Sequence, residues 1–535
     1  MDDFVVKCKY IFVSGGSCTA DAERAPIIAS VARLLKARAL KAELLRLDPA
    51  CNVNLTLMDG RDCGEHYVCA DGGAAPFVFG TYERLGGLTT SSAQCVTFGS
   101  LLSDLLEVEK RTDRDIPLVG FEDTMSEFIA GSIIAASGKS QADAMLIDIG
   151  GCPEDLSSRL VQRAIQRLRY EMGDHNSTAI HIITLPEGSD AARLGAVRLA
   201  WQSLQAQGIR IDMLVCRSKT PLSAQLKERI AILCDLPTEA IIYVAKDATL
   251  TLPTALNNQR MDNLLCRQLE LDTREPRLSE WLELLEAIDN ARDRITVALV
   301  GRRLHHSALY ISVQEALRHA ALANGCRLEL LQVDAGDLLG DEGVDLLADA
   351  DCILIAGEEQ LDPDSEIAAA NYARLHAVPL LALGAGTAAV VIEYARNVLG
   401  MKGAAVRGED SGHCVYPVMQ VTEEFHAGRH LSLGCQNIAI TPGSRAAAAY
   451  GKPDARERFR YLYRMNNDFR ESFSEAGLRV TGTTHSRDIA AIIELPSHPW
   501  YVALQFHPEF NSQPQQPHRL LCAFIAAALK RRDLD

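Results

Sequence analysis

The feature that most constrains the fold of this chain is a series of short apolar runs, each ending in glycine or polar residues and separated by amphipathic segments. The first run, residues 10–16 (YIFVSGG), is followed by a helical pattern and then by a second apolar run at 44–48. A strand, a helix and a further strand form a βαβ unit, whose right-handed crossover makes the two strands parallel. Further runs of this kind follow at 142–151, 179–188, 211–218 and 240–247. The amino-terminal half is therefore predicted to be a doubly wound α/β domain with a parallel sheet.

A second set of apolar runs predicts a second α/β domain. Residues 268–293 are polar and helical in pattern, with Pro276 as an interruption, and are interpreted as a linker. The later runs end in glycine or polar residues, at the strand ends where α/β proteins place their sites. These runs occupy residues 295–301, 328–334, 352–357, 378–386, 491–495 and 501–510. The predicted organisation is a first domain over 1–267, the linker, and a second domain over 294–535.

Charge and cysteine usage exclude several classes of function. The chain has 70 acidic and 54 basic residues, a net charge of −16, whereas a nucleic-acid partner would require a basic face. An alternation of arginine with aromatic residues at 456–464 is therefore interpreted as a solvated or interface surface. The 15 cysteines show no paired CxxC spacing, so neither a disulfide framework nor a metal site built from them is expected.

Targeting and membrane segments are not expected either. No apolar run approaches the roughly 20 residues that a membrane-spanning helix requires. Met1 is followed by Asp2 and Asp3 and not by a basic and then apolar leader. With thiols that are expected to be reduced, these features predict a cytoplasmic protein without membrane partners.

The turn after the first strand is where a phosphate-binding loop would lie. Gly15 and Gly16 supply the small residues that such a loop needs, but no lysine follows to reach the phosphates, and Glu23 adds a negative charge. Pro26 suits the first turn of the next helix. Both interpretations stay open from these residues: a nucleotide site, or a plain strand-to-helix turn.

His507 and Glu509 follow the last strand on a proline-stiffened turn. In a glutamine-hydrolysing site such a pair is the base and its orienting carboxylate, and together they activate a cysteine on a sharp strand-to-helix elbow. The matching elbow spans residues 380–396, and its apex is Gly384, which has no side chain to attack a substrate. Cys435 is the nearest later cysteine but has no elbow-like context, so it is interpreted as a structural thiol.

Asp148 lies at the end of an apolar strand, where a magnesium ligand would be expected. A single carboxylate in this position is also a common helix cap or turn former. Asp48, Asp71 and Asp155 are further candidates. Asp148 is the preferred candidate for a metal ligand.

Over essentially its whole length the chain resembles the CTP synthases. The ordered matches include KYIFVSGG, GTYERL, IDIGG, GIRIDMLVCRS, ILCDLPTEAII, NNDFRESFSEAGLRVTGT and LPSHPWYVALQFHPEF. The resemblance implies an amino-terminal P-loop-like amidoligase domain with a doubly wound sheet and a carboxy-terminal α/β domain of the class I glutaminase type. In that family the first domain uses ATP and Mg²⁺ to phosphorylate UTP, and the second supplies ammonia from glutamine. ATP and Mg²⁺ are therefore the cofactors that the resemblance implies.

Departures from the family pattern fall on the chemistry of the first domain. The family loop Gly-Gly-x-x-Ser-x-Leu-Gly-Lys-Gly is GGSCTADAERA here, so its lysine is absent and Arg24 is the candidate substitute. Arg46 replaces the lysine before Leu-Asp-Pro, and Val78 replaces an aspartate that binds magnesium. Asp148 replaces a glutamate ligand. The residues that would contact nucleotide or cofactor, by resemblance, are Gly15, Gly16, Arg24, Arg46 and Arg193.

The second domain departs from the family in the same way. The resemblance places Gly384 at the nucleophile position, within ALGAGTA for the family's Gly-Ile-Cys-Leu-Gly-Met-Gln. The oxyanion loop becomes residues 356–360 (AGEEQ), and two arginines that hold glutamine become Leu462 and Ser432. The histidine and glutamate of the dyad remain as a base and an orienting acid with no nucleophile to activate.

These departures predict a catalytically inactive CTP-synthase-like protein, a pseudoenzyme retained for assembly or regulation. The expected partners are further copies of the chain, as a dimer or tetramer, or an active CTP synthase, because the family assembles through its amidoligase domain. The alternative is a repurposed ATP-dependent amidoligase that uses free ammonia or another amine on a substrate other than UTP. A nucleotide-sensing module without turnover is a third hypothesis.

Overall fold

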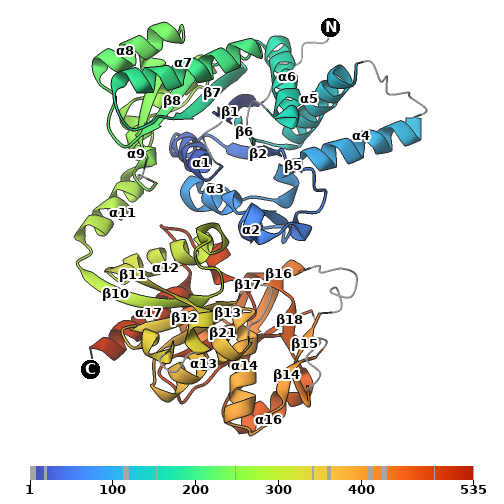
Figure 1. Cartoon of the computed structure of the whole chain (residues 1–535), viewed down its shortest axis with the longest axis vertical. Helices are drawn as coiled ribbons and strands as arrows, with labels where there is room; N and C mark the ends of the chain where they lie inside the picture. The colour runs from blue at the N-terminus through green and yellow to red at the C-terminus, as the bar shows by residue number, and fades with distance from the viewer. Residues whose placement is uncertain are drawn as a thin grey trace. The chain divides into compact units, whose positions relative to one another are not determined.

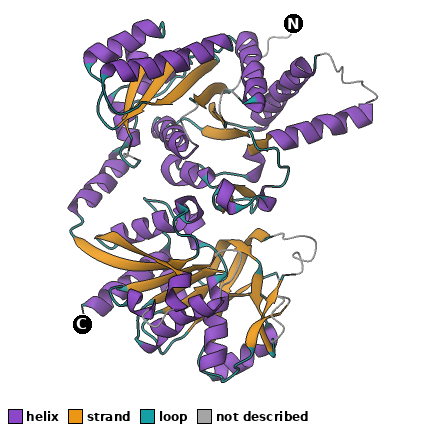
Figure 2. Cartoon of the chain, in the orientation of Figure 1, coloured by secondary structure: helices purple, strands orange, loops and turns teal. Residues whose placement is uncertain are grey.

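The computed structural model describes residues 8–16, 21–112, 120–151, 155–246, 249–339, 343–357, 363–407, 414–422, 431–486 and 488–533. The chain divides into two compact units. The first unit comprises residues 1–54 and 81–282, and the second comprises residues 55–80 and 283–535. Each unit is built from strands with helices packed on them (Figures 1 and 2).

The first unit is built on a seven-stranded sheet with the order β5-β2-β6-β1-β7-β8-β9. All neighbouring strands in it run parallel, as crossover connections require. The doubly wound sheet predicted for this half is therefore confirmed. Its strands are β1 (Lys9–Gly15), β2 (Ala42–Asp48), β5 (Cys95–Thr97), β6 (Ala144–Ile149), β7 (Ser177–Thr184), β8 (Met213–Ser218) and β9 (Ile241–Ala245).

Helices cover both faces of this sheet. Strand alternation sends Tyr10 and Phe12 of β1 into a core formed with α4, α5 and α6, and α1 packs on the opposite face over β1, β2 and β6. The helices are α1 (Asp21–Ala37), α3 (Val78–Gly86), α4 (Phe98–Thr112), α5 (Phe121–Lys139), α6 (Leu156–Met172), α7 (Asp190–Ala206), α8 (Ala224–Leu233), α9 (Leu252–Asn258), α10 (Met261–Gln268) and α11 (Ser279–Asn290).

The second unit contains a nine-stranded sheet with the order β11-β10-β12-β13-β21-β20-β19-β16-β17. The strands from β11 to β21 are parallel, and the remaining pairs are antiparallel. The strands are β10 (Asp293–Gly301), β11 (Cys326–Asp334), β12 (Cys352–Gly357), β13 (Leu380–Gly384), β16 (Ser432–Ile440), β17 (Asp454–Tyr461), β19 (Arg479–Thr484), β20 (Ala490–Glu494) and β21 (Tyr501–Leu504).

Two small sheets and a set of helices complete the second unit. The small sheets are formed by β14 (Ala404–Arg407), β15 (Tyr416–Val421) and β18 (Tyr463–Met465), and by β3 (His66–Val68) and β4 (Ala74–Pro76). The helices are α2 (Gly60–Cys63), α12 (Ile311–Ala323), α13 (Pro363–Leu375), α14 (Gly386–Asn397), α15 (Arg445–Tyr450), α16 (Arg470–Glu475) and α17 (Arg519–Arg532).

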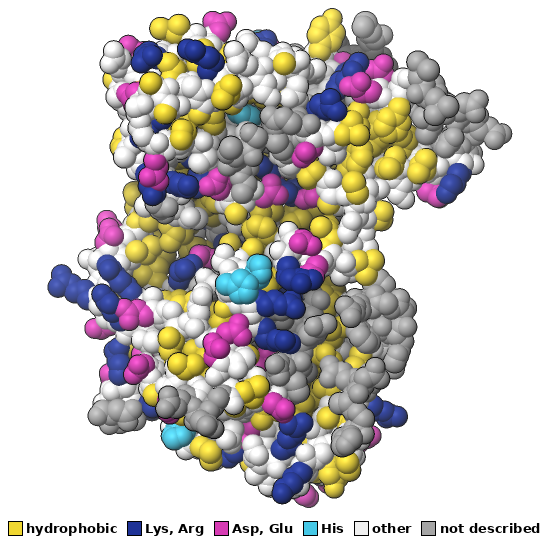
Figure 3. Space-filling model, in the orientation of Figure 1, with side chains coloured by type: hydrophobic (Ala, Val, Ile, Leu, Met, Phe, Trp, Pro, Cys, Tyr) yellow, Lys and Arg dark blue, Asp and Glu magenta, His cyan; other side chains and the backbone are white. Residues whose placement is uncertain are grey.

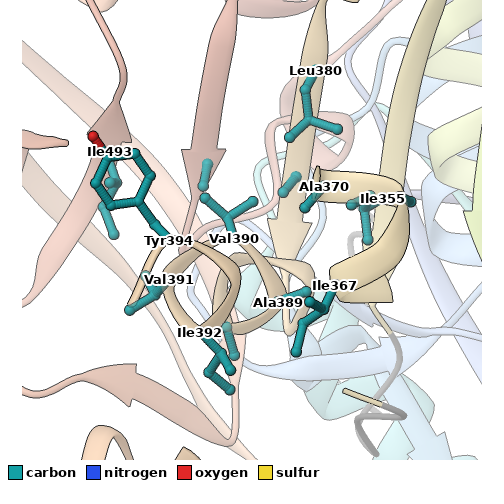
Figure 4. Close-up of a cluster of buried hydrophobic side chains, with 14 of the residues drawn as sticks. Ile355, Ile367, Ala370, Leu380, Ala389, Val390, Val391, Ile392, Tyr394 and Ile493 are labelled. Atoms are coloured by element: carbon teal, nitrogen blue, oxygen red, sulfur yellow. The ribbon is translucent and has the colours of Figure 1, made fainter. Parts of the chain in front are cut away.

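Helix α14 is the centre of the larger core of the second unit. Every residue from Gly386 to Ala395 is buried, and the apolar run from Ala388 to Ile392 at its middle is typical of a helix inside a core. Figure 4 shows Val390 of α14 and Leu380 of β13 within the same cluster of buried hydrophobic side chains. Gly384, the last residue of β13, therefore leads directly into this core.

The division into units differs from the predicted domain boundaries in one respect. Residues 55–80 were predicted to belong to the first domain, but they form part of the second unit. Their hairpin buries Tyr67 completely, and its hydroxyl donates to the Phe510 carbonyl oxygen at 3.2 Å. The predicted linker, 268–293, contains the break after Leu282 and is helical over α11. Among the described residues, the helices all fall short of the length and apolarity that crossing a membrane requires.

Candidate functional site

A buried cluster of charged side chains lies at the carboxyl end of the first unit's sheet. Arg46 of β2 and Asp148 of β6 are register partners on the face that α1 covers. Arg46 Nη1 and Arg24 Nε donate to the two different oxygens of Asp148, each at 2.5 Å. The Tyr82 hydroxyl donates to Asp148 Oδ2 at 2.5 Å, and burial together with this carboxylate raises the pKa of Tyr82 well above its usual value. Both oxygens of the predicted metal ligand are therefore occupied by donors.

Two further aspartates complete this cluster. Asp21 Oδ1 accepts from Arg24 Nη2 at 2.5 Å, and Asp21 Oδ2 accepts from Arg46 Nη2. Arg46 Nε donates to Asp48 Oδ2 at 2.8 Å. Arg24 and Arg46 are 0% and 1% exposed, so their charges depend on these carboxylates for compensation.

The cluster does not fit the magnesium ion that the family implies. Magnesium requires oxygen ligands at about 2.0–2.1 Å in octahedral geometry, whereas the Asp148 oxygens are held by two guanidinium groups. Val78, at the position of the other family ligand, is a buried apolar residue. Over the part of the chain that the structure describes, no group of three or more histidine, cysteine, aspartate or glutamate side chains is placed to hold a metal ion.

The glycine turn after β1 is described only in part. Gly15 ends the strand, and the Gly16 amide donates to the Ile182 carbonyl oxygen at 2.9 Å, so this amide is used within the sheet. Residues 17–20, where the rest of the predicted phosphate loop would lie, are outside the described residues. The described part of the turn therefore continues the hydrogen bonding between β1 and β7.

Arg193 and Glu23 are bound to other partners. Arg193 of α7 donates to Thr220 Oγ1, and its Nη1 lies 3.8 Å from Asp190 Oδ1. Glu23 pairs with Arg217 at 3.1 Å. Arg24 and Arg46 thus bind Asp148, the predicted metal ligand. The bonds described for Arg193 are to other residues.

Gly384 occupies a nucleophile elbow in the second unit. It is the last residue of β13, two residues before α14 begins, and its φ is +55°, a conformation that favours glycine. A strand, a sharp turn and a helix with the reactive residue at the turn is the geometry that exposes a nucleophile. A Cβ atom built on Gly384 would lie only 2.8 Å from Cε1 and Nε2 of His507. The imidazole therefore fills the space that a nucleophilic side chain would need.

His507 and Glu509 form the predicted dyad at this elbow. His507 Nδ1 lies 2.6 Å from Glu509 Oε1, and both side chains are buried. His507 Nε2 lies 2.8 Å from the Arg460 carbonyl oxygen. Because a carbonyl oxygen only accepts, this bond requires a proton on Nε2, which donates it. The nitrogen that would take a proton from a nucleophile is therefore already a donor.

Backbone oxygens of the hairpin β3–β4 bind two arginines of β17, a contact that no pattern in the sequence indicates. Arg460 Nη1 donates to the His66 carbonyl oxygen at 2.7 Å. Arg458 Nη1 donates to the Val68 carbonyl oxygen and the Tyr67 hydroxyl, each at 2.9 Å. The arginine–aromatic alternation, predicted to form a solvated or interface surface, thus serves at these two arginines as an internal contact.

Cys435 has the environment of a structural thiol. Its Sγ donates to the Ala70 carbonyl oxygen at 3.3 Å. Burial raises the pKa of Cys435 above its usual 9.0, against the opposing effect of nearby arginines, so the thiol stays protonated and poorly nucleophilic.

Of the other positions at which the sequence departs from the family's glutamine site, the structure describes Leu462 and Ser432. Leu462 lies in the α14 core, and Ser432 begins β16 as a buried residue. Glu358, Glu359 and Gln360 of the predicted oxyanion loop lie outside the described residues.

The charged cluster of the first unit should respond to acid through Asp21. Burial raises the pKa of Asp21, but the guanidinium groups of Arg46 and Arg24 outweigh it and lower this pKa from 3.8 to about 2. A lowered pKa contributes stability above the unfolded value, and that stability is lost as the pH falls through the folded value. We expect the free energy of unfolding to fall more steeply from about pH 4 to about pH 2 in the wild type than in Asp21→Asn, by urea denaturation at each pH. Equal pH dependence in the two proteins would contradict this role.

The fold of the second unit, its elbow and its dyad define a protein of the class I glutamine amidotransferase type. The family model described as "Glutamine amidotransferase class-I" matches residues 308–527, and the model described as "CTP synthase N-terminus" matches residues 9–271. The chain belongs to the CTP synthase family, as the resemblance in the sequence predicted.

Relatives in this family match over nearly the whole chain. The CTP synthase of Bacillus licheniformis is 33% identical over 530 residues, which cover 98% of this chain and 99% of that protein. The CTP synthase of Carboxydothermus hydrogenoformans is 33% identical over 534 residues, with the same coverage of 98% and 99%. A solved glutaminase domain of Trypanosoma brucei CTPS with bound acivicin is 30% identical, with a TM-score of 0.42, and the match covers 44% of this chain and 94% of that chain.

Proposed function

We propose that this member of the CTP synthase family neither hydrolyses glutamine nor makes CTP, and that it acts by assembling with copies of itself or with an active CTP synthase. The observation that carries this proposal is the elbow at Gly384, where His507 fills the nucleophile's space and donates to the Arg460 carbonyl oxygen. Loss of the nucleophile from a catalytic triad lowers kcat by about 10⁶-fold.

The first unit supports the same proposal independently. Phosphoryl transfer depends on positive charge and metal ions that stabilise the moving phosphoryl group. Here Arg24 and Arg46 each form an ion pair with Asp148, so the positive charges of the site are compensated by the chain's own carboxylate. This also counts against the alternative of an amidoligase with another substrate, because that enzyme would still require ATP chemistry.

Exposed apolar side chains support a role in assembly. Figure 3 shows hydrophobic side chains gathered over α4 and α5. In these helices Leu106, Val108 and Phe121 are 43%, 44% and 39% exposed. Apolar surface of this kind commonly marks a protein interface.

The proposal is tested by measuring catalysis and assembly on one preparation. Glutamate release from glutamine, and CTP formation from UTP, ATP and Mg²⁺ with glutamine or with ammonia, are followed beside the Bacillus licheniformis CTP synthase. We expect neither product above the rate without protein. Mass photometry of the chain, alone and mixed with an active CTP synthase from its own cell, is expected to show homo- or hetero-oligomers.

Each result bears on a separate part of the proposal. CTP formation with glutamine would overturn it altogether. CTP formation with ammonia but without glutamine hydrolysis would overturn the loss of catalysis in the first unit and leave the loss of glutamine hydrolysis intact. A monomer that does not join CTP synthase would overturn the assembly role while leaving the loss of catalysis intact.

A further inference from the structure

Arg46 makes an unusual set of contacts for a buried side chain. Its three guanidinium nitrogens reach three different carboxylates: Nη1 lies 2.5 Å from Asp148, Nε lies 2.8 Å from Asp48, and Nη2 bonds to Asp21. The side chain is 1% exposed, so water contributes almost nothing to this arrangement. A single cation that gathers several carboxylates in a buried site has the coordination role that proteins usually give to a metal ion.

Arg24 supplies a second cation from the helix side. Its Nε and Nη2 donate to Asp148 Oδ1 and Asp21 Oδ1, each at 2.5 Å. Burial opposes the charged form of Arg46, but the surrounding carboxylates outweigh it and raise the pKa of Arg46 well above its usual value. Two permanently charged arginines therefore compensate most of the negative charge of the three carboxylates. Little negative charge remains to attract an additional cation.

We propose that Arg46, assisted by Arg24, is a resident cation that takes the place of a divalent metal at Asp21, Asp48 and Asp148. The cluster is then complete without Mg²⁺, and it joins α1 to β2 and β6 through the chain's own side chains. A divalent ion would have to displace two guanidinium groups and would be repelled by both. This inference concerns metal binding by the first unit and does not depend on the loss of the nucleophile at Gly384.

The test uses the full chain and Mn²⁺ alone as the probe. Free Mn²⁺ is measured by electron paramagnetic resonance during titration, and the melting temperature is followed in parallel. Wild type is expected to bind no Mn²⁺ at this cluster and to show no metal-dependent melting shift. Arg46→Met, which removes the charge but keeps a long side chain, is expected to gain one site with a Kd of about 10⁻⁴–10⁻³ M and a higher melting temperature with Mn²⁺. Asp48→Asn added to Arg46→Met should abolish this gain.

Each outcome decides the proposal. Wild-type Mn²⁺ binding that Asp48→Asn removes would overturn it, as would a folded Arg46→Met that gains no site. If circular dichroism shows that Arg46→Met is unfolded, a titration of wild type beside Asp48→Asn decides alone. None of these measurements involves turnover, so CTP formation in the catalytic assay would leave this result interpretable.

Discussion

Asp148→Asn is expected to lower the free energy of unfolding of the first unit by about 3–5 kcal/mol, the usual cost of leaving a buried charge without its partner. Asp148 binds Arg24 and Arg46 through separate oxygens, and both guanidinium groups are buried. An amide at this position offers one acceptor oxygen, and its nitrogen would face a second donor. At least one arginine would therefore lose its compensating charge.

Native-state hydrogen exchange measures this effect unit by unit. Peptides from β1 and β6 should exchange faster in Asp148→Asn, while peptides from β12 and β13 of the second unit serve as an internal reference. Asp174→Asn is the matched control, because Asp174 pairs with Arg210 at 3.4 Å on the surface and its side chain is 62% exposed. This control should change stability by less than about 1 kcal/mol. A loss no larger in Asp148→Asn would mean that the cluster contributes little to folding.

Gly384→Cys is expected not to restore glutamine hydrolysis, although it returns the family's nucleophile to the elbow. The added Cβ would lie 2.8 Å from two atoms of the His507 ring, so the imidazole must move before the thiol fits. His507 Nε2 also donates to the Arg460 carbonyl oxygen and has no free lone pair for the thiol proton. A non-glycine residue at φ +55° further costs about 1–3 kcal/mol of stability in the second unit.

Glutamate release and urea denaturation test both parts of this expectation. Gly195→Cys is the control: it introduces the same side chain into α7, where a Cβ meets no atom within 4 Å, and it should be tolerated. Hydrolysis by Gly384→Cys that His507→Ala abolishes would contradict the prediction. Such a result would show that the dyad can return to catalysis once a nucleophile is present.

Much of the fold could be predicted from the residues because strand periodicity and βαβ order are local properties. The strands that contain Gly15, Asp148 and Gly384 are where the apolar runs place them. The assignment of residues 55–80 to the second unit could not be predicted in this way. It depends on which core buries Tyr67, and that core is formed by residues hundreds of positions later in the chain.

The candidate residues divide in the same way. The apolar runs place Asp148 and Arg46 each at a strand end, where the sequence predicts a metal ligand and, by resemblance, a nucleotide contact. Their register pairing on β6 and β2 brings them into contact with each other. Arg24 joins them from α1, and a side-chain bond across three elements leaves no periodic signal in the sequence.

By itself, the sequence determined the two α/β halves, the membership of the CTP synthase family and the absence of a nucleophile at Gly384, because each follows from which residues stand in which order. Only the tertiary structure decided what the remaining polar groups do. In the folded chain Arg24 and Arg46 bind Asp148, and His507 occupies the space beside Gly384. The physical reason is that buried charges and donors must find partners, and the available partners are set by packing rather than by position along the chain.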